Sequence, residues 1–260
     1  MAKSSIRNST AQNDHPSGKT QDSGDVHGQK GQHNHETKEL LKELRSADAI
    51  YFGDFDALNN SGVNGTALIT VDYGKANTIA DDLMTVRIMA SGLDAGVHLQ
   101  HMHGFEDGRN AVTPDKGDDT DQDGYVELLE GLPDYGPILL NLDDAKGGFP
   151  VTSAEGSYVF EQTYHLQGDS APHASHAGDT VTSFENLDLN HLVIHGMFVP
   201  EGAGAGTAGE VGDQDTSGIT FDLDAYKDVL PVAVAELESA SYREARDMVS
   251  AWASDGGFFA

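Results

Sequence analysis

Residues 92–104, GLDAGVHLQHMHG, carry three histidines within six positions. Successive side chains of a β-strand point to opposite faces, so His101 and His103 share one face, whereas His98 lies on the other with Gln100 and Met102. Two imidazoles on one strand face supply half of a metal site. We therefore predict a metal-binding strand in which His98 lies behind the ligands and supports them, for example by holding a backbone carbonyl.

A second segment, NHLVIHG at 190–196, completes the predicted site. His191 and His195 share one strand face, and apolar side chains occupy the opposite, core-facing side. We predict that His101, His103 and His195 converge on one metal ion, copper or zinc, because neutral imidazole suits both. His191 is a candidate fourth ligand, and exposure to solvent is the alternative that we favour for it. For the cluster as a whole, the alternative is a set of hydrogen-bonded structural histidines.

The remaining chain predicts an all-β domain over residues 49–237. Short apolar runs bounded by Gly, Asn and Asp recur without a long helical pattern between them, which favours an antiparallel barrel or sandwich. The long segments 104–136, 167–189 and 200–217 are expected to carry function or to be mobile. The predicted strands are 49–58, 63–72, 83–91, 97–104, 137–142, 157–166, 190–199, 218–223 and 229–237.

The two ends differ from this domain. Residues 1–35 are polar and predict a disordered tail, whose histidines (His15, His27, His33 and His35) give a loose metal-scavenging role as the lesser alternative. Residues 36–48 predict a short amphipathic helix with its leucines on one side. The pattern over 236–253 predicts a C-terminal helix, so that 238–260 form a terminal helix and tail.

Charge and composition exclude several classes of partner. Lys and Arg total 15 against 43 Asp and Glu, a formal charge of −28, which argues against nucleic acids and anionic membranes. The spread of acidity along the chain is typical of a halophilic protein, or of an acidic protein that binds many cations. Cysteine is absent, so metal ligands must be His, carboxylates or backbone. Metal ions are the expected partners, and a homo-oligomer is left open.

No apolar run is long enough to span a membrane, and the N-terminus lacks the apolar region of a secretory signal. A cytoplasmic location is therefore expected, with export or attachment to the cell surface as the alternative.

A calcium-binding loop is predicted at DTDQDGYVELLE, residues 119–130. The segment fits the twelve-position pattern D-x-D-x-D-G…E, whose carboxylates and one carbonyl provide the hard oxygen ligands of Ca²⁺. No flanking helices are expected, since Gly131 and Pro133 follow at once, so we predict a structural clamp. The alternative is an acidic surface loop. The predicted ligands are Asp119, Asp121, Asp123, the Tyr125 carbonyl, Glu127 and Glu130.

A third motif, PHASHAGD at 172–179, offers His173, His176 and Asp179 as a second metal site. A polar loop is the interpretation that we favour, because nothing in the sequence fixes the geometry of these side chains.

The histidine stretch is similar to the copper-binding strand of copper/zinc superoxide dismutases, with the same H-x-x-H-x-H spacing. LVIHG (192–196) resembles the segment that supplies a later copper ligand in that family, and LPVAVAEL (230–237) resembles its last strand. The resemblance implies an antiparallel Greek-key barrel with copper ligands at His101, His103 and His195 and a structural histidine at His98.

A closer resemblance is to prokaryotic chordin-type (CHRD) domain proteins. Four motifs occur in the same order as in that group: ALNNSGVNG (57–65), QHMHGFEDGRN (100–110), DTDQDG (119–124) and EGLPDYGPILLNL (130–142). The resemblance covers about residues 49–237 and implies the fold more strongly than an activity.

The chain lacks several features that the dismutases use for their reaction. Residues 104–164 contain no histidine for a bridging or zinc ligand, and HAGD (176–179) lies later in the chain than the family's zinc loop. The family's disulfide cannot form, because the chain has no cysteine. The dismutases also have an arginine after their last copper ligand that steers superoxide, and no arginine lies between His195 and Tyr242 here. Arg109 could take that role only if the fold brings it near the histidines. We therefore predict a metal-binding domain with a mononuclear copper or zinc site, a calcium loop and a redox role. The alternatives are a β interaction module or a metal-storage protein without turnover.

Overall fold

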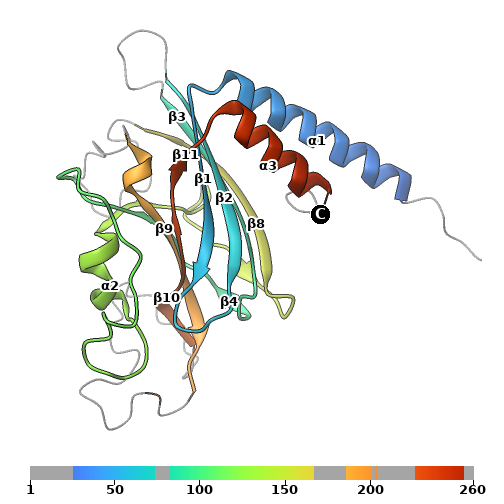
Figure 1. Ribbon diagram of the computed structural model, residues 1–260. Coiled ribbons are helices and arrows are strands. Elements are labelled where there is room, and N and C mark those ends of the chain that lie inside the picture. The colour runs from blue at the N-terminus through green and yellow to red at the C-terminus, as the bar shows by residue number, and fades with distance from the viewer. Residues whose placement is uncertain (1–25, 74–81, 167–185, 201–202, 204–225, 255–260) are drawn as a thin grey trace, which may run out of the picture.

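The apolar runs form one curled antiparallel sheet, a half-barrel, in the computed structural model (Figure 1). The structure describes residues 26–73, 82–166, 186–200, 203 and 226–254. The strands follow the order β6-β5-β9-β10-β1-β2-β3-β8, with β11 paired to β1 and a separate β4-β7 pair. Their bounds are β1 Ala49–Ala57, β2 Asn64–Asp72, β3 Leu83–Ser91, β4 Gly96–Val97, β5 Gln100–His103, β6 Ile138–Asn141, β7 Val151–Thr152, β8 Ser157–His165, β9 His191–Phe198, β10 Tyr226–Glu236 and β11 Glu238–Ser239.

The connections have Greek-key character. β1, β2 and β3 are consecutive neighbours, after which the chain crosses to β5 and β6 at the other edge of the sheet and returns to β8 beside β3. β9 then pairs with β5, and β10 joins β9 to β1. The predicted all-β fold with terminal helices is confirmed, and the predicted strand at 218–223 lies outside the described residues.

The structure divides one predicted strand and adds two short ones. The run 97–104 divides into β4 and β5 because the amide of His98 bonds to Pro150 O (2.8 Å) and the carbonyl of Leu99 accepts from His195 N (2.8 Å). The two-residue strands β7 and β11 were not predicted, because two residues carry no periodicity.

The concave face of the sheet holds the main apolar core. Alternate residues of β3, including Met84, Val86 and Ile88, point inward and meet Met102 of β5 and Ile194 of β9. All five side chains are fully buried, as the period-two pattern of half-buried strands requires. The opposite side of β5 and β9 therefore faces outward, and this is the side that carries the histidines.

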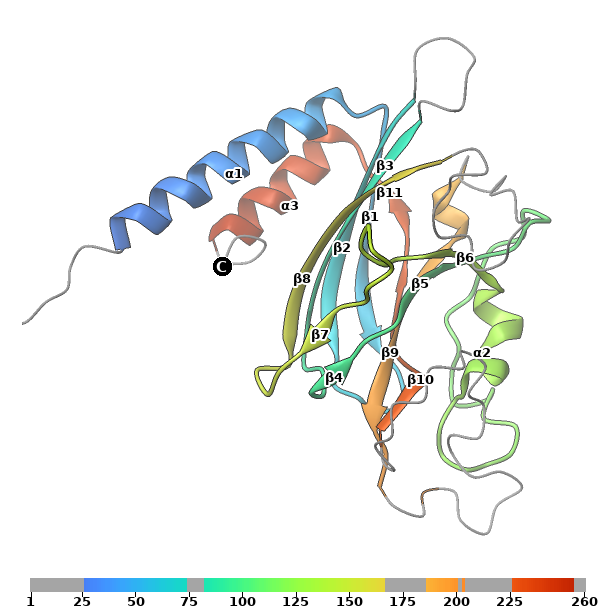
Figure 2. The same cartoon turned by 180° about the vertical axis from the view of Figure 1, so that it is seen from behind.

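Helices α1 (Val26–Ser46) and α3 (Tyr242–Ser254) lie side by side over the outer face of the β1-β2-β3 region (Figures 1 and 2). Leu40 and Leu44 of α1 pack with Leu68 of β2 and with Ala245 and Val249 of α3 in a second core. The structure thus places an amphipathic helix where one was predicted, but α1 begins at Val26 instead of residue 36. Residues 26–35 contain no proline, so a helix nucleated by the leucine face can extend through them, although Gly28 and Gly31 each cost about 1 kcal/mol relative to alanine.

Helix α3 begins later than residue 236, where the predicted pattern started. β10 and β11 occupy 226–239, and the helix starts after Ser241, whose hydroxyl accepts from Glu244 N (3.3 Å) while Glu244 Oε2 accepts from Ser241 N (2.8 Å). This reciprocal cap fixes the first turn. No helix in the described part of the chain has the length and apolarity to cross a lipid bilayer.

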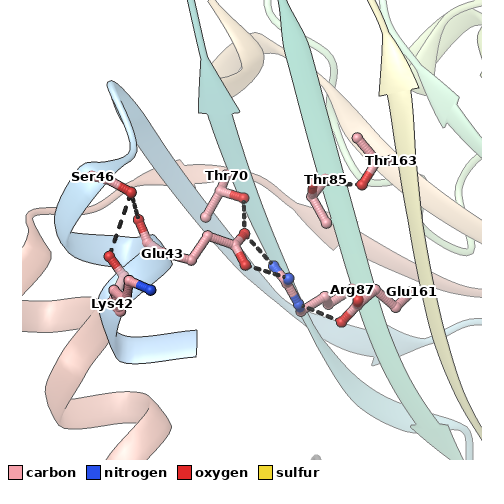
Figure 3. A network of polar contacts seen from close by, with 8 residues as sticks. All are labelled: Lys42, Glu43, Ser46, Thr70, Thr85, Arg87, Glu161 and Thr163. Carbon is pink, nitrogen blue, oxygen red and sulfur yellow. Dashed lines mark hydrogen bonds and ion pairs between the residues drawn. The ribbon is translucent and has the colours of Figure 1, made fainter. Parts of the chain in front are cut away.

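A buried arginine fixes α1 to the sheet (Figure 3). Arg87 of β3 donates two hydrogen bonds to the carboxylate of Glu43 in α1, at 2.9 and 2.7 Å, and one from Nε to Glu161 of β8, at 2.8 Å. The Thr70 hydroxyl donates to the same Glu43 carboxylate at 2.7 Å. The Arg87 side chain is 8% exposed, so these partners are needed to compensate its lost hydration.

Helix α2 (Leu128–Tyr135) covers a different part of the same outer sheet face, beside β9 and β10 (Figure 1). It contradicts the expectation that no helix follows the acidic loop. Glu127 and Glu130 form a reciprocal capping box that starts the helix, and Pro133 lies inside the helix, where proline cannot donate a hydrogen bond to the carbonyl four residues earlier. Tyr135 packs against Val193 and Val234 on the outer sheet face, so α2 covers the strand that carries His195.

Candidate metal centre

Pairing of β5 with β9 brings the histidines of the two strands to one face. His101 lies opposite Val193, and His103 lies opposite His191. Because alternate residues share a face, His101, His103, His191 and His195 all project from the outer side of these strands, away from Met102. The face alternation predicted from the sequence thus agrees with the observed register.

Three of these histidines offer converging nitrogen atoms. One ring nitrogen each from His101, His103 and His195 lies within 4.8 Å of the other two. The ring centroids are 5.0 Å apart for His101 and His195, 5.7 Å for His101 and His103, and 6.1 Å for His103 and His195. A metal with nitrogen ligands at about 2.0–2.1 Å separates those ligands by roughly 3–4 Å, so modest ring rotations suffice to reach it.

The same side chains have buried nitrogens without hydrogen-bond partners in the described part of the chain. These atoms are Nδ1 of His101, Nε2 of His103 and Nε2 of His195. A buried polar atom without a partner carries a desolvation cost of about 1–3 kcal/mol. Three such atoms in one cluster therefore fit a group that each of them would bind.

Backbone carbonyls orient two of the rings. His103 donates from Nδ1 to Gly136 O at 2.7 Å, and His195 donates from Nδ1 to Val229 O at 2.7 Å. A proton on Nδ1 leaves the Nε2 of each neutral ring with a free lone pair, which is the tautomer that a metal requires.

Aromatic side chains enclose the cluster, and the histidines themselves are buried. Phe149 lies edge-on to His101 at 5.8 Å, and Tyr135 lies edge-on to His103 at 4.6 Å. His101, at 7% exposure, is the most open of the three histidines, while His103 and His195 are at most 1% exposed. Solvent therefore reaches the cluster most readily along His101.

Burial keeps these imidazoles neutral. It lowers the pKa of His103 to about 3, with the His195 ring as the second cause, although the hydrogen bond to Gly136 opposes the shift. Burial lowers the pKa of His195 to about 4, and burial followed by its two neighbouring rings holds the pKa of His101 well below its usual value. All three rings are unprotonated at neutral pH, as ligation requires.

His98 lies behind the cluster, as predicted. Its Nδ1 donates to His195 O at 2.9 Å, and its Nε2 lies 2.9 Å from Asp94 O and 3.0 Å from Thr152 Oγ1. Gly196 makes this approach possible, because its φ is +105° and a Cβ there would lie 2.4 Å from the Tyr226 hydroxyl and 3.1 Å from His98 Nδ1. The predicted contact between His98 and a backbone carbonyl is confirmed, and that carbonyl belongs to His195.

The expectation that His191 is exposed to solvent is wrong. Its side chain is completely buried, and burial lowers its pKa to about 4. It lies outside the three-histidine group, although both of its ring nitrogens are buried without hydrogen-bond partners among the described residues. Which segments pack over the outward face of a strand is decided by the tertiary structure, so the strand pattern alone could not reveal this burial.

A second group of candidate ligands lies in the acidic loop. One carboxylate oxygen each from Asp119, Asp121 and Asp123 lies within 4.8 Å of the other two. Glu130 accepts from Thr120 N at 2.7 Å, so the twelfth position of the loop reaches back to the second. The structure thus brings together three of the six predicted calcium ligands, Asp119, Asp121 and Asp123, while Glu127 and Glu130 form the capping box of α2.

The remaining predicted residues lie outside the described part of the chain or in a different loop. His173, His176 and Asp179 lie outside the described residues, as does His15 of the tail. Arg109 lies 3.5 Å above the Phe105 ring and pairs with Asp107 at 3.6 Å, both within its own loop.

Sequence reasoning missed the groups that hold the cluster in place. Gly136, Val229, Tyr135 and Phe149 contact the histidine rings through backbone carbonyls or ring edges, which leave no periodic signal. No protein-family model, curated protein or solved structure matches the chain. The assignment of a function therefore depends on the geometry of this site.

Proposed function

We propose that this protein binds one transition-metal ion, copper or zinc, through His101, His103 and His195. The observation that supports this most directly is the convergence of three buried imidazole rings, each of which has one nitrogen without a hydrogen-bond partner among the described residues. Bound metal would remove all three desolvation costs at once.

The donor set selects the class of metal. Three neutral imidazoles are intermediate ligands that suit copper and zinc, whereas magnesium and calcium require oxygen ligands. Between the two, copper is favoured, because divalent copper binds nitrogen ligands more tightly than zinc and because the histidine spacing resembles that of the copper strand in superoxide dismutases.

Three protein ligands leave one or more coordination positions open. The partial exposure of His101 gives a small molecule a route to such a position, while Phe149 and Tyr135 limit the space around it. Copper held there would supply one-electron chemistry toward a small oxidant or reductant. The protein itself would supply the fixed Nδ1 protons on His103 and His195 and the dry surroundings that keep the ligands neutral.

Metal stoichiometry tests the proposal. The purified chain would be loaded with Cu²⁺ or Zn²⁺, desalted, and analysed for bound metal. We expect one ion per chain, lost in His103→Ala and His195→Ala and retained in His165→Ala, a matched histidine that is exposed on β8. Replacing the four tail histidines with asparagine tests the storage alternative. Binding that disappears with the tail and survives the two cluster variants would overturn the proposal.

Redox function needs a second measurement. Copper-loaded protein that accelerates superoxide decay, with the acceleration lost in His195→Ala, would support a redox enzyme. Stoichiometric copper without turnover would support the alternative of a binding module. The formal charge of −28 predicts that any reaction with an anion is slowest at low salt.

A further inference from the structure

The acidic loop after β5 holds its carboxylates in a closed arrangement. Asp119 accepts hydrogen bonds from Asp123 N (3.2 Å) and Gly124 N (3.0 Å), and Asp121 accepts one from Asp123 N (3.2 Å). Gln122 and Gly124 have φ values of +65° and +99°, which turn the chain sharply within the loop. Two oxygens bound to one calcium at about 2.3–2.6 Å can lie no more than roughly 5 Å apart, and the three aspartates satisfy this limit.

One carboxylate oxygen in this loop points to a bound cation. Asp123 is 8% exposed, its Oδ1 accepts from Tyr125 N at 2.8 Å, and its Oδ2 is buried without a partner among the described residues. Burial raises the pKa of Asp123 in spite of the Tyr125 hydrogen bond, and the charges of Asp121, Asp119 and Glu130 raise it further. A cation among these oxygens would reverse that repulsion and satisfy Oδ2.

Glu130 connects this loop to α2. Its Oε1 accepts from the amide and hydroxyl of Thr120, at 2.7 and 2.8 Å, and its Oε2 accepts from Glu127 N at 3.0 Å. Glu130 also lies in the first turn of α2. The carboxylate that would complete a calcium shell is therefore part of the helix.

The other end of α2 touches the histidine cluster. The Tyr135 hydroxyl donates to Leu128 O at 2.7 Å, and the Tyr135 ring lies against His103. Gly136, the residue after the helix, donates to Leu132 O at 3.0 Å and accepts from His103 Nδ1. Five helical residues, 131–135, thus separate Glu130 of the acidic loop from Gly136, which orients His103.

We propose that Ca²⁺ binds the acidic loop through Asp119, Asp121, Asp123, Glu130 and the Tyr125 carbonyl, and that its occupancy positions α2 and thereby the His103 ring. The oxygen-only donor set, with four negative charges, suits calcium and differs from the all-nitrogen set of the histidine cluster. The second half of the proposal rests on the proposed function, because it requires the histidine cluster to bind metal. By linkage, calcium and the transition metal then strengthen each other's binding.

Calcium binding is tested by titration calorimetry of the full chain with CaCl₂, without transition metal. We expect one Ca²⁺ per chain, lost in Asp123→Asn and Glu130→Gln and retained in Glu106→Gln, an exposed carboxylate of the same segment. Asp121→Asn is the second variant, since Asp121 is less buried and the amide oxygen of asparagine can still accept from Asp123 N. No binding by the wild-type chain, or equal binding by all variants, would overturn the site.

Coupling is tested by measuring Zn²⁺ affinity with and without saturating Ca²⁺, with His103→Ala titrated in parallel to subtract zinc that binds elsewhere. We expect calcium to tighten zinc binding about tenfold in the wild type and to have no effect in Glu130→Gln. Calcium binding with an unchanged zinc affinity would overturn the coupling alone. If zinc does not bind, the same titration is made with Cu²⁺; if neither ion binds under either condition, the proposed function fails, whereas the calcium isotherm still decides the acidic site.

Discussion

The Nδ1 of His103 and the carbonyl oxygen of Gly136 are 2.7 Å apart, and this hydrogen bond joins β5 to the end of α2. It fixes the tautomer of His103 and the direction of its free Nε2. Because Gly136 follows the helix directly, any displacement of α2 is transmitted to this ring. A substitution at Gly136 therefore tests whether α2 orients the His103 ring.

Gly136→Ala should weaken metal binding and lower stability together. Gly136 has a φ of +82°, and a Cβ there would lie 2.4 Å from Gly104 O, so the backbone must shift. We expect a loss of about 2–4 kcal/mol in the free energy of unfolding, measured with urea, and a zinc affinity at least about tenfold lower.

Gly108→Ala is the matched control for this variant. Its φ is +76°, but nothing lies within 4 Å of the added Cβ, so it reports the conformational cost alone, about 1 kcal/mol. Equal effects of the two substitutions would contradict the role given to Gly136.

His98→Ala should reduce stability strongly and metal affinity moderately. The substitution removes the donor to His195 O and leaves buried oxygens of Asp94 and Thr152 with fewer partners. We expect a cost of about 3–5 kcal/mol and a metal affinity about tenfold lower with the stoichiometry retained. Loss of the whole metal equivalent in folded protein would instead make His98 a ligand.

The metal-free protein should lose stability as the pH falls below about 6.5. The folded pKa values of His191 and His195, about 4, lie below the unfolded value, so the unfolded state binds more protons between about pH 6.5 and 4. Each histidine then contributes about 1.4 kcal/mol of destabilisation per pH unit in that window. Unfolding by urea at about pH 7 and about pH 5.5, with chelator present, measures the slope.

His195→Gln should reduce the pH dependence of the free energy of unfolding by the contribution of one histidine, about 1.4 kcal/mol per pH unit. A slope that is the same in wild type and variant would show that His195 is not held neutral by the fold. Above about pH 6.5 both proteins should show little dependence on pH from these groups, because the histidines are neutral in both the folded and the unfolded state.

Arg87→Met should loosen α1 without affecting the metal site. It leaves Glu43 of α1 with the Thr70 hydroxyl as its remaining partner from this network. We expect a loss of roughly 2–4 kcal/mol, below that of a fully enclosed ion pair because Glu161 is well exposed. Lys42→Ala, which breaks an exposed 3.5 Å pair with Glu39, should cost less than about 1 kcal/mol. Unchanged metal stoichiometry in both variants is the second readout.

Salt should stabilise the protein. At a formal charge of −28, self-repulsion opposes the compact state and is screened as the Debye length falls from about 10 Å in 0.1 M salt to about 3 Å in 1 M salt. The midpoint of thermal unfolding should rise across this range. A flat or falling midpoint would contradict the interpretation of the acidic surface as an adaptation to brine.

Local sequence rules were enough to predict much of this protein. Alternation placed His101 and His103 on one face and Met102 on the other, and it located most of the strands, because a strand's side-chain period is two residues. The spacing of Asp119, Asp121 and Asp123 predicted their convergence for a similar reason, since a turn of fixed length dictates which side chains meet.

The tertiary structure decided which distant residues complete the site. The β5–β9 pairing brings His195, 92 positions after His103, to the same cluster, and it is the packing over β9 that buries His191, which the strand pattern had left to solvent. The carbonyls of Gly136 and Val229 orient the rings, yet every residue has a carbonyl, so no sequence signal marks these two. The sequence by itself therefore determined the strands and the types of ligand. Packing between distant segments determined which histidine nitrogens are buried and how the rings are oriented. It also placed α2 between the acidic loop and the His103 ring.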